Sequence, residues 1–331
     1  MPSPRVTHAC VEFNGRPLGL DVVIEPMNKD FLRHNFGHAK GNLYEAYLQD
    51  IDQKLDPDNG KDSSQSDVKA LLEVTKIPDR SNRWERLNQV LDVDRYVAHL
   101  VVELFTSHTD GYAMNRNNYP IYHDAATGRF VFFGHGIDWA FANTEVSIVP
   151  PESSLVTRAV LQTPPGRSLF NQRRAELFTN IFRLEILTNR VTKAVAKLKA
   201  AARDANEARQ FQSYGDEMPH RIMARHQSIL EQFARLERKP LAFDTAGVAG
   251  MTELLGAPAS LPASGAGGEQ VPAWMPALPG RTIPAGGPYF GMELVRAFAP
   301  SSSLGSSAVL RSSLFPACPA TRLFYSHSRC S

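Results

Sequence analysis

Cysteine is scarce in this chain, and so is any surplus of charge of one sign. Only three cysteines occur among the 331 residues, Cys10, Cys318 and Cys330. Their number is odd and they lie far apart, so neither a disulfide framework nor the spacing of a zinc site can be derived from them. The formal net charge is +2 at pH 7, which gives no strong attraction to nucleic acid or to an anionic membrane.

Long apolar runs are absent as well. No segment reaches the length of about 20 apolar residues that a membrane-spanning helix needs. The N-terminus, Met-Pro-Ser-Pro-Arg, lacks the apolar core of a signal peptide. We therefore expect no membrane span and see no export signal, and the location of the protein stays unknown.

The chain contains enough apolar material for one or two cores, with 43% hydrophobic and 21% charged residues. Near the N-terminus, segments 11–13 and 18–24 flank Asn14-Gly15, a dipeptide typical of a tight β-hairpin turn. Glu25, Pro26 and Met27 then break the strand before a short helix expected over residues 28–35. An ordinary connector is the simplest interpretation of this junction.

Helical spacing of apolar residues follows in segments 67–75 and 81–90, and a longer helix is predicted over 93–106 with Asp92 as its N-cap. This helix is apolar over enough of its surface to be a buried central one, and it ends directly before Asp110. Segment 56–62 resembles a calcium loop, but Gly60 falls at the fifth position and Asp67, instead of Glu, at the twelfth. We expect a solvated acidic loop there.

After Asp138, proline pairs precede three helices expected near residues 168–182, 183–202 and 216–236. Arg221, Arg225 and Arg235 are expected on a solvated helical face, with contact to an acidic substrate as the alternative. Residues 245–331 contain 10 Pro, 11 Gly and only 8 charged side chains. That composition predicts a disordered tail.

The stretch from residue 108 to 141 carries the chemistry. His108, Asp110 and Asn115 form the pattern His-x-Asp-x-x-x-x-Asn, the spacing that protein kinases use for a catalytic Asp and a metal-binding Asn. Asp138 is followed by an aromatic residue, as is the metal-binding Asp of the second kinase motif. His108 itself is expected to be a structural hydrogen-bonding residue.

A hairpin is expected between these two motifs. Segments 118–122 and 129–133 are rich in aromatic and β-branched residues, and 124–128 has the composition of a turn. With the turn centred near Ala126, Asn115 and Asp138 are almost equally far from it, so antiparallel pairing would bring them together to share one metal. Asp110 would face the same place.

The alternative is a loop that hydrogen-bonds itself. Asp and Asn beside Gly are commonest in turns, and the short pattern by itself is permissive.

A series of short blocks makes the chain resemble a known family. The blocks occur in order at residues 11–25, 28–32, 41–44, 91–96, 109–112, 117–119, 122 and 136–141. In their order and spacing over about residues 9–240 they resemble the spore coat protein H (CotH) kinase family, atypical protein kinases that use ATP and a divalent metal to phosphorylate protein.

The resemblance implies an α+β, atypical protein-kinase-like fold with a mainly helical C-terminal lobe. Residues 1–27 would be the remnant of the N-terminal lobe, with hairpin and hinge, 28–244 the C-terminal lobe, and 245–331 the disordered tail. It further implies that Asp110 is catalytic, that Asn115 and Asp138 bind Mg²⁺, and that Glu25 and Met27 hold the adenine of ATP. The partner would be a protein substrate.

Two departures from the family lead to a second hypothesis. No strand bearing the lysine that contacts the phosphates precedes residue 11, so we expect an N-terminally truncated domain lacking most of that lobe. Glu45 follows the block 41–44 where the family commonly has Lys, and it would repel ATP if it lies close. The alternative to a kinase is therefore an inactive pseudokinase or a surface or coat interaction protein. Relatives are often in the cell envelope, in the spore coat or secreted.

Overall fold

The computed structural model describes residues 2–60, 64–238 and 308–311. These residues fall into two compact units. The smaller unit contains residues 8–23 together with 308–311, and the larger contains residues 2–7, 24–60 and 64–238. All residues of the proposed site belong to the larger unit.

The smaller unit is a β-hairpin with a third strand. Strands β1 (Val6–Phe13) and β2 (Arg16–Ile24) are joined at Asn14 and Gly15, whose φ values of 51° and 76° are those of a tight hairpin turn. This confirms the predicted hairpin. Strand β7 (Ala308–Arg311) pairs antiparallel with β1.

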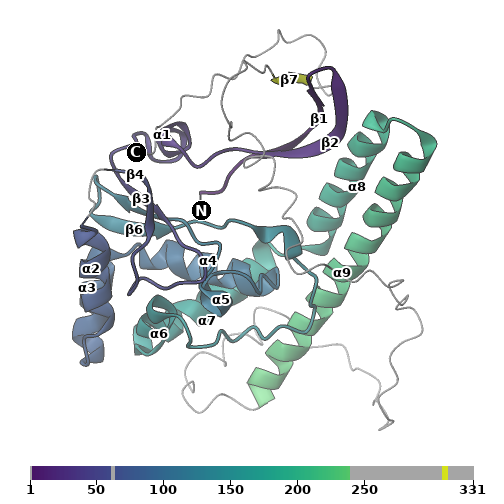
Figure 1. The fold of residues 1–331 in the computed structure, drawn as a ribbon. Helices are drawn as coiled ribbons and strands as arrows, with labels where there is room; N and C mark the ends of the chain where they lie inside the picture. The colour runs from purple at the N-terminus through teal and green to yellow at the C-terminus, as the bar shows by residue number, and fades with distance from the viewer. Residues whose placement is uncertain (1, 61–63, 239–307, 312–331) are drawn as a thin grey trace. The chain divides into compact units, whose positions relative to one another are not determined.

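The larger unit is built around a four-stranded antiparallel sheet of order β4-β3-β5-β6 (Figure 1). The predicted hairpin forms β5 and β6, with Tyr122 opposite Val131. The acidic segment was expected to be a loop, but it forms the edge strand β4, because pairing with β3 overrides the weak strand propensity of Asp-Pro-Asp-Asn, and proline is tolerated at an edge. The strands are β3 (Gly41–Glu45), β4 (Asp56–Asn59), β5 (Ile121–Asp124) and β6 (Arg129–Phe132).

Helices make up most of the larger unit, as predicted, and the long pair α8 and α9 runs antiparallel (Figure 1). The proline pair at 164–165 was expected to precede the helix near residues 168–182, but it lies in the first turn of α7, where a missing N–H costs nothing. Helix α6 was not predicted. The helices are α1 (Lys29–Phe36), α2 (Ser66–Thr75), α3 (Arg80–Val90), α4 (Val93–Phe105), α5 (Tyr112–Asn115), the 3₁₀ turn η1 (Ile137–Trp139), α6 (Leu155–Leu161), α7 (Pro164–Asn180), α8 (Leu184–Ala201) and α9 (Ala205–Arg238).

Helix α9 is longer than its apolar pattern indicated and continues through Pro219. It packs along α8, and an added Cβ on Gly215 would lie only 2.3 Å from a methyl group of Val195. The close contact between the two helices accounts for a length that local propensity does not predict.

Strands β5 and β6 are buried on both faces of the sheet, whereas the edge strand β4 is exposed. Residues alternate between a large core and a smaller one: Ile121 and Phe132 join the first, and Tyr122 and Val131 the second. Helix α4 contributes most of its residues to the large core, and α1 closes the small one with Phe31 and other apolar residues. The sheet and α4 thus form a rigid support for the loops at one end of β5 and β6.

The fold agrees with the predicted α+β class. The kinase-like lobes remain a prediction, as does the division into residues 1–27, 28–244 and 245–331. Residues 245–331, for which a disordered tail is predicted, lie outside the described part of the chain apart from 308–311, which form β7. Among the described helices, none has the length and apolar character needed to cross a bilayer.

Candidate functional site

Helix α4 leads directly into the loop that carries Asp110. The Asp92 side chain caps its first turn by accepting a hydrogen bond from Arg95 N. At its other end Ser107 has a φ of 57°, in the left-handed region, which turns the chain sharply away from the helix axis. The His108 N–H then donates to Glu103 O at 2.8 Å. The loop therefore starts from a buried helix and has little freedom at its origin.

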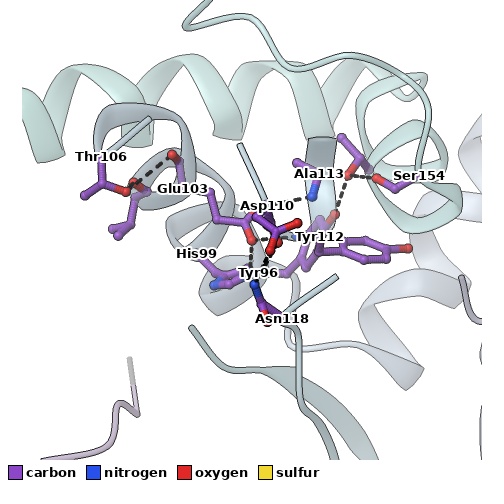
Figure 2. Close-up of polar contacts among 11 residues, drawn as sticks. Tyr96, His99, Glu103, Thr106, Asp110, Tyr112, Ala113, Asn118 and Ser154 are labelled. Atoms are coloured by element: carbon purple, nitrogen blue, oxygen red, sulfur yellow. Dashed lines mark hydrogen bonds and ion pairs between the residues drawn. The ribbon is translucent and has the colours of Figure 1, made fainter. Parts of the chain in front are cut away.

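The Asp110 carboxylate is held by three asparagine side chains. Asn115 Nδ2 donates to Oδ1 at 2.6 Å, and Asn117 and Asn118 donate to Oδ2 at 3.0 and 2.7 Å. Figure 2 shows the contact between Asn118 and Asp110. A carboxylate can only accept, so each amide must direct its nitrogen toward Asp110 and its oxygen elsewhere. The predicted pair Asp110 and Asn115 is thus in direct contact.

Asn117 and Asn118 were not predicted as site residues, although both lie in the stretch that resembles the family. The Asn117 oxygen accepts a hydrogen bond from Leu48 N at 3.3 Å, so this buried amide joins Asp110 to a neighbouring segment. The Asn115 oxygen accepts no hydrogen bond within the described part of the chain. It therefore remains available to a cation.

Asp138 lies in η1, after the end of β6, and its side chain is exposed. The β5–β6 pairing ends with the bond from Phe133 N to Pro120 O. We predicted that strand pairing would place Asn115 opposite Asp138, and this prediction is wrong. Asn115 lies in α5 and not in a strand, because the chain leaves the strand conformation at Asn118, where φ is 50°.

Two other contacts bring the Asp138 segment to the Asp110 loop. Gly136 lies against Asn118, so that an added Cβ would be 2.7 Å from Asn118 Cγ. On the other side, Phe141 N donates to Thr106 O at the end of α4, at 2.7 Å. Asp138 thus lies between two anchor points on the segment that holds Asp110. Its role as a metal ligand remains a prediction.

Buried titratable groups lie behind the loop. Both oxygens of Glu103 accept backbone N–H groups, from Tyr112 at 2.9 Å and Ala113 at 3.1 Å. Burial by itself would raise the pKa of Glu103, but His99, His108 and the Ala113 N–H outweigh it and hold this pKa below its usual value. Glu103 is therefore ionised at neutral pH, which sequence analysis did not reveal.

Two histidines lie beside the proposed carboxylates. Burial lowers the pKa of both His108 and His135, although Asp138 acts in the opposite direction on each. Both rings are therefore neutral at pH 7 and do not offset the negative charge of Asp110 and Asp138. His108 was expected to form structural hydrogen bonds, but neither of its buried ring nitrogens has a hydrogen-bond partner in the described part of the chain.

Arg225 of α9 was expected on a solvated face, and this expectation is wrong, because its side chain is fully buried. It donates to the carbonyls of Leu104 and Phe105 at the end of α4, and to those of Thr144 and Val146 beyond η1. Burial lowers its pKa to about 10, so it stays protonated at neutral pH. A cation at the C-terminal end of a helix is also favoured by the helix dipole. Arg225 thus joins the segments that carry Asp110 and Asp138.

The residues proposed for adenine lie at the junction of β2 and α1. The Glu25 carboxylate pairs with the Arg5 guanidinium at 2.5 Å, and the backbone N–H of Glu25 donates to Arg5 O at 2.8 Å. The Met27 side chain is buried in the small core. Any contact to a nucleotide would therefore come from backbone atoms other than the Glu25 N–H, and the two assignments remain predictions.

The donor set fits magnesium better than a metal held by protein alone. No group of three or more His, Cys, Asp or Glu side chains able to hold a metal occurs among residues 2–60, 64–238 and 308–311. Mg²⁺, however, usually keeps several waters and takes one or two carboxylates plus substrate phosphates. A free amide oxygen on Asn115 and an exposed carboxylate on Asp138 are hard oxygen ligands of this kind.

Comparison with known families identifies the group to which the chain is related. A family model described as CotH kinase protein matches residues 1–239. The chain belongs to the CotH kinase protein family. The comparison with curated proteins gave no match. The CotH match covers every residue of the candidate site, and membership in this family implies an atypical protein kinase that uses ATP.

Proposed function

We propose that this CotH family member transfers the γ-phosphoryl group of ATP to a hydroxyl group of a protein substrate. The contact between Asp110 and Asn115 carries the proposal. It joins the Asp and the Asn of the His-x-Asp-x-x-x-x-Asn pattern through a hydrogen bond of 2.6 Å from Asn115 Nδ2 to Asp110 Oδ1, and it leaves the Asn115 oxygen free. Asp110 would serve the acceptor, and Asn115 and Asp138 would hold Mg²⁺. The ion would neutralise the phosphate charge.

The hydrogen bonds of Asp110 support its role toward an acceptor. An ionised carboxylate has about four lone-pair positions. Asn117 and Asn118 take two on Oδ2, and Asn115 takes one on Oδ1. One position on Oδ1 is left to accept the hydroxyl hydrogen. The hydroxyl oxygen would bond to the γ-phosphorus as the bond to the ADP oxygen breaks, and its proton would pass to Asp110.

A pocket of about 200 Å³ beside the loop is a suitable entry for the acceptor chain. Leu48, in the wall of the pocket, donates its N–H to the Asn117 side chain, and this side chain in turn donates to Asp110. Asp52 and Arg116, also in the wall, form no ion pair with another described residue, so both charges are available to a polar peptide. The remaining lining residues are Gln49, Asp50, Gln53, Ser153 and Leu155.

The carboxylates around Glu45 favour the second candidate function, an inactive pseudokinase or a surface or coat interaction protein. Glu45 is the cross-strand partner of Asp56. Partial desolvation, Asp58 and Asp56 raise the pKa of Glu45, although the residue is exposed to solvent. If ATP approaches this part of β3, the cluster would repel its phosphates.

Transfer from radiolabelled ATP to a generic protein acceptor, compared between wild type and Asp110→Ala, tests the proposal. We expect Mg²⁺-dependent labelling by the wild type and a loss of about 10² or more in Asp110→Ala, the magnitude typical of a group acting in the transition state. Labelling that is unchanged in Asp110→Ala would contradict the assignment. Binding of ATP without any transfer would favour the pseudokinase.

A further inference from the structure

Glu103 occupies a position that no part of the proposed chemistry uses. It lies in the last turn of α4, and its side chain is only 5% exposed. The carboxylate accepts the N–H groups of Tyr112 and Ala113, the first two residues of α5 (Figure 2). Helix α5 has no side-chain cap of its own, since Gly111 is at the N-cap position. Glu103 therefore supplies from another helix the acceptors that a capping residue would normally provide.

The same residue also holds the other end of the loop. Its backbone oxygen accepts the His108 N–H at 2.8 Å. The segment 108–112 is thus fixed to Glu103 on both sides of Asp110, through the main chain before it and through the carboxylate after it. Only Thr109 and Gly111 separate Asp110 from these attachment points, so a shift of the carboxylate must move the catalytic side chain.

Close packing confirms how tightly the loop lies on Glu103. An added Cβ on Gly111 would be 2.3 Å from Glu103 Oε1 and 2.6 Å from His108 Cδ2. No side chain fits there, which explains the glycine directly after Asp110. His99, one turn earlier on α4, places Nε2 at 3.2 Å from the same Glu103 oxygen. This contact lacks hydrogen-bond geometry, so within the described residues the hydrogen bonds of the carboxylate are the two to the loop side.

We infer that Glu103 is the positioning residue of the catalytic loop: its main-chain oxygen holds the backbone before Asp110 and its carboxylate holds the backbone after it, so that the three asparagines can orient the Asp110 side chain. This inference rests on the proposed role of Asp110. Glu103 touches neither the acceptor nor the nucleotide in this scheme, and its effect on phosphoryl transfer passes through the loop.

The substitution Glu103→Gln tests the inference with little change in volume. Glutamine has one oxygen acceptor, so it can satisfy only one of the two N–H groups, and its own NH₂ faces the other. We expect amide hydrogen exchange at Tyr112 and Ala113 to accelerate by about tenfold or more, and phosphoryl transfer to slow by about 10², the effect of misplacing a reacting group by roughly 1 Å.

Asp67→Asn is the matched control. Asp67 is also a well-buried carboxylate, which accepts hydrogen bonds from Asn42, Tyr44 and Val68 N. Its contacts are with β3, α2 and β5 and none is with segment 108–118. This variant should lose stability but keep the exchange rates of Tyr112 and Ala113. If Glu103→Gln does not fold, Glu103→Asp, which keeps the charge on a shorter side chain, is compared in the same way.

A double-mutant cycle with Asp110→Ala separates positioning from general destabilisation. A positioning residue should cost nothing further in the transfer rate once Asp110 is absent, whereas a merely structural residue would slow both backgrounds by the same factor. Equal slowing overturns the inference, and so does unchanged exchange at Tyr112 and Ala113 in the folded variant, whatever the activity. If Asp110→Ala has no effect on transfer while the exchange result holds, the proposed function fails and the anchoring of the loop stands.

Discussion

Replacing Arg225 by Met should destabilise the protein far more than a helix-surface substitution does. The guanidinium donates to four backbone carbonyls. Leu104 O also accepts from Ser107 N, and Val146 O also accepts from Gln232, both at 3.1 Å. The carbonyls of Phe105 and Thr144 would be left without a partner. At about 1–3 kcal/mol for each unsatisfied buried acceptor, the expected loss in the free energy of unfolding is about 2–6 kcal/mol.

The assay is urea denaturation of the full chain, followed by circular dichroism, with Arg221→Met as control. Arg221 lies one turn earlier on α9, is partly exposed and pairs with Glu217 on the same helix, so its loss should cost less than about 0.5 kcal/mol. If Arg225→Met costs less than about 1 kcal/mol, or no more than Arg221→Met, then Arg225 does not join the end of α4 to the segment after Asp138 as described. Methionine retains most of the apolar stem, so the difference reports mainly on the hydrogen bonds.

Two further predictions concern the sheet and the site. The hydrogen bond with Asp67 raises the pKa of His123, so stability from this pair should be fully present below the unfolded pKa of about 6.5 and should be lost as pH rises through the folded value. The stability difference between wild type and His123→Gln should therefore shrink from pH 6 upward, and a difference that grows would contradict the charge pair. Gly136→Ala, where φ is 62° and a Cβ meets Asn118, should lose about 1–2 kcal/mol through backbone strain and also slow transfer. Gly128→Ala, with φ 68° and open space around the new Cβ, should show the strain alone, and equal transfer rates in the two variants would refute the contact argument.

Local signals in the sequence predicted a large part of the fold. Asn14-Gly15 requires the positive φ values that the turn shows, and Asp92 caps α4 as its position before an apolar helical pattern indicates. The β5–β6 hairpin has the expected register around its turn. Strand β4 could not be predicted, because Asp-Pro-Asp-Asn becomes a strand only through pairing with β3.

The site was predictable where the residues lie close in sequence. Asp110 and Asn115 were paired by spacing alone, and they do make contact. The position of Asp138 depends on where the strand pairing ends, which the pattern of residues 118–133 does not reveal. Glu103 and Arg225 lie on amphipathic helices at positions where periodicity does not distinguish a buried charge from an exposed one. Their burial depends on backbone groups brought to them by distant segments.

The affinity for ATP with and without Mg²⁺ tests the proposed metal site most directly. Isothermal titration calorimetry of the wild type, Asp138→Ala and Asp110→Ala would measure it under matched conditions. The proposed roles predict Mg²⁺-dependent ATP binding by the wild type, little change in Asp110→Ala, and a loss of at least about tenfold, or 1.4 kcal/mol, in Asp138→Ala. Equal affinity in the wild type and Asp138→Ala would contradict the assignment of Asp138 as a ligand of the metal-phosphate complex.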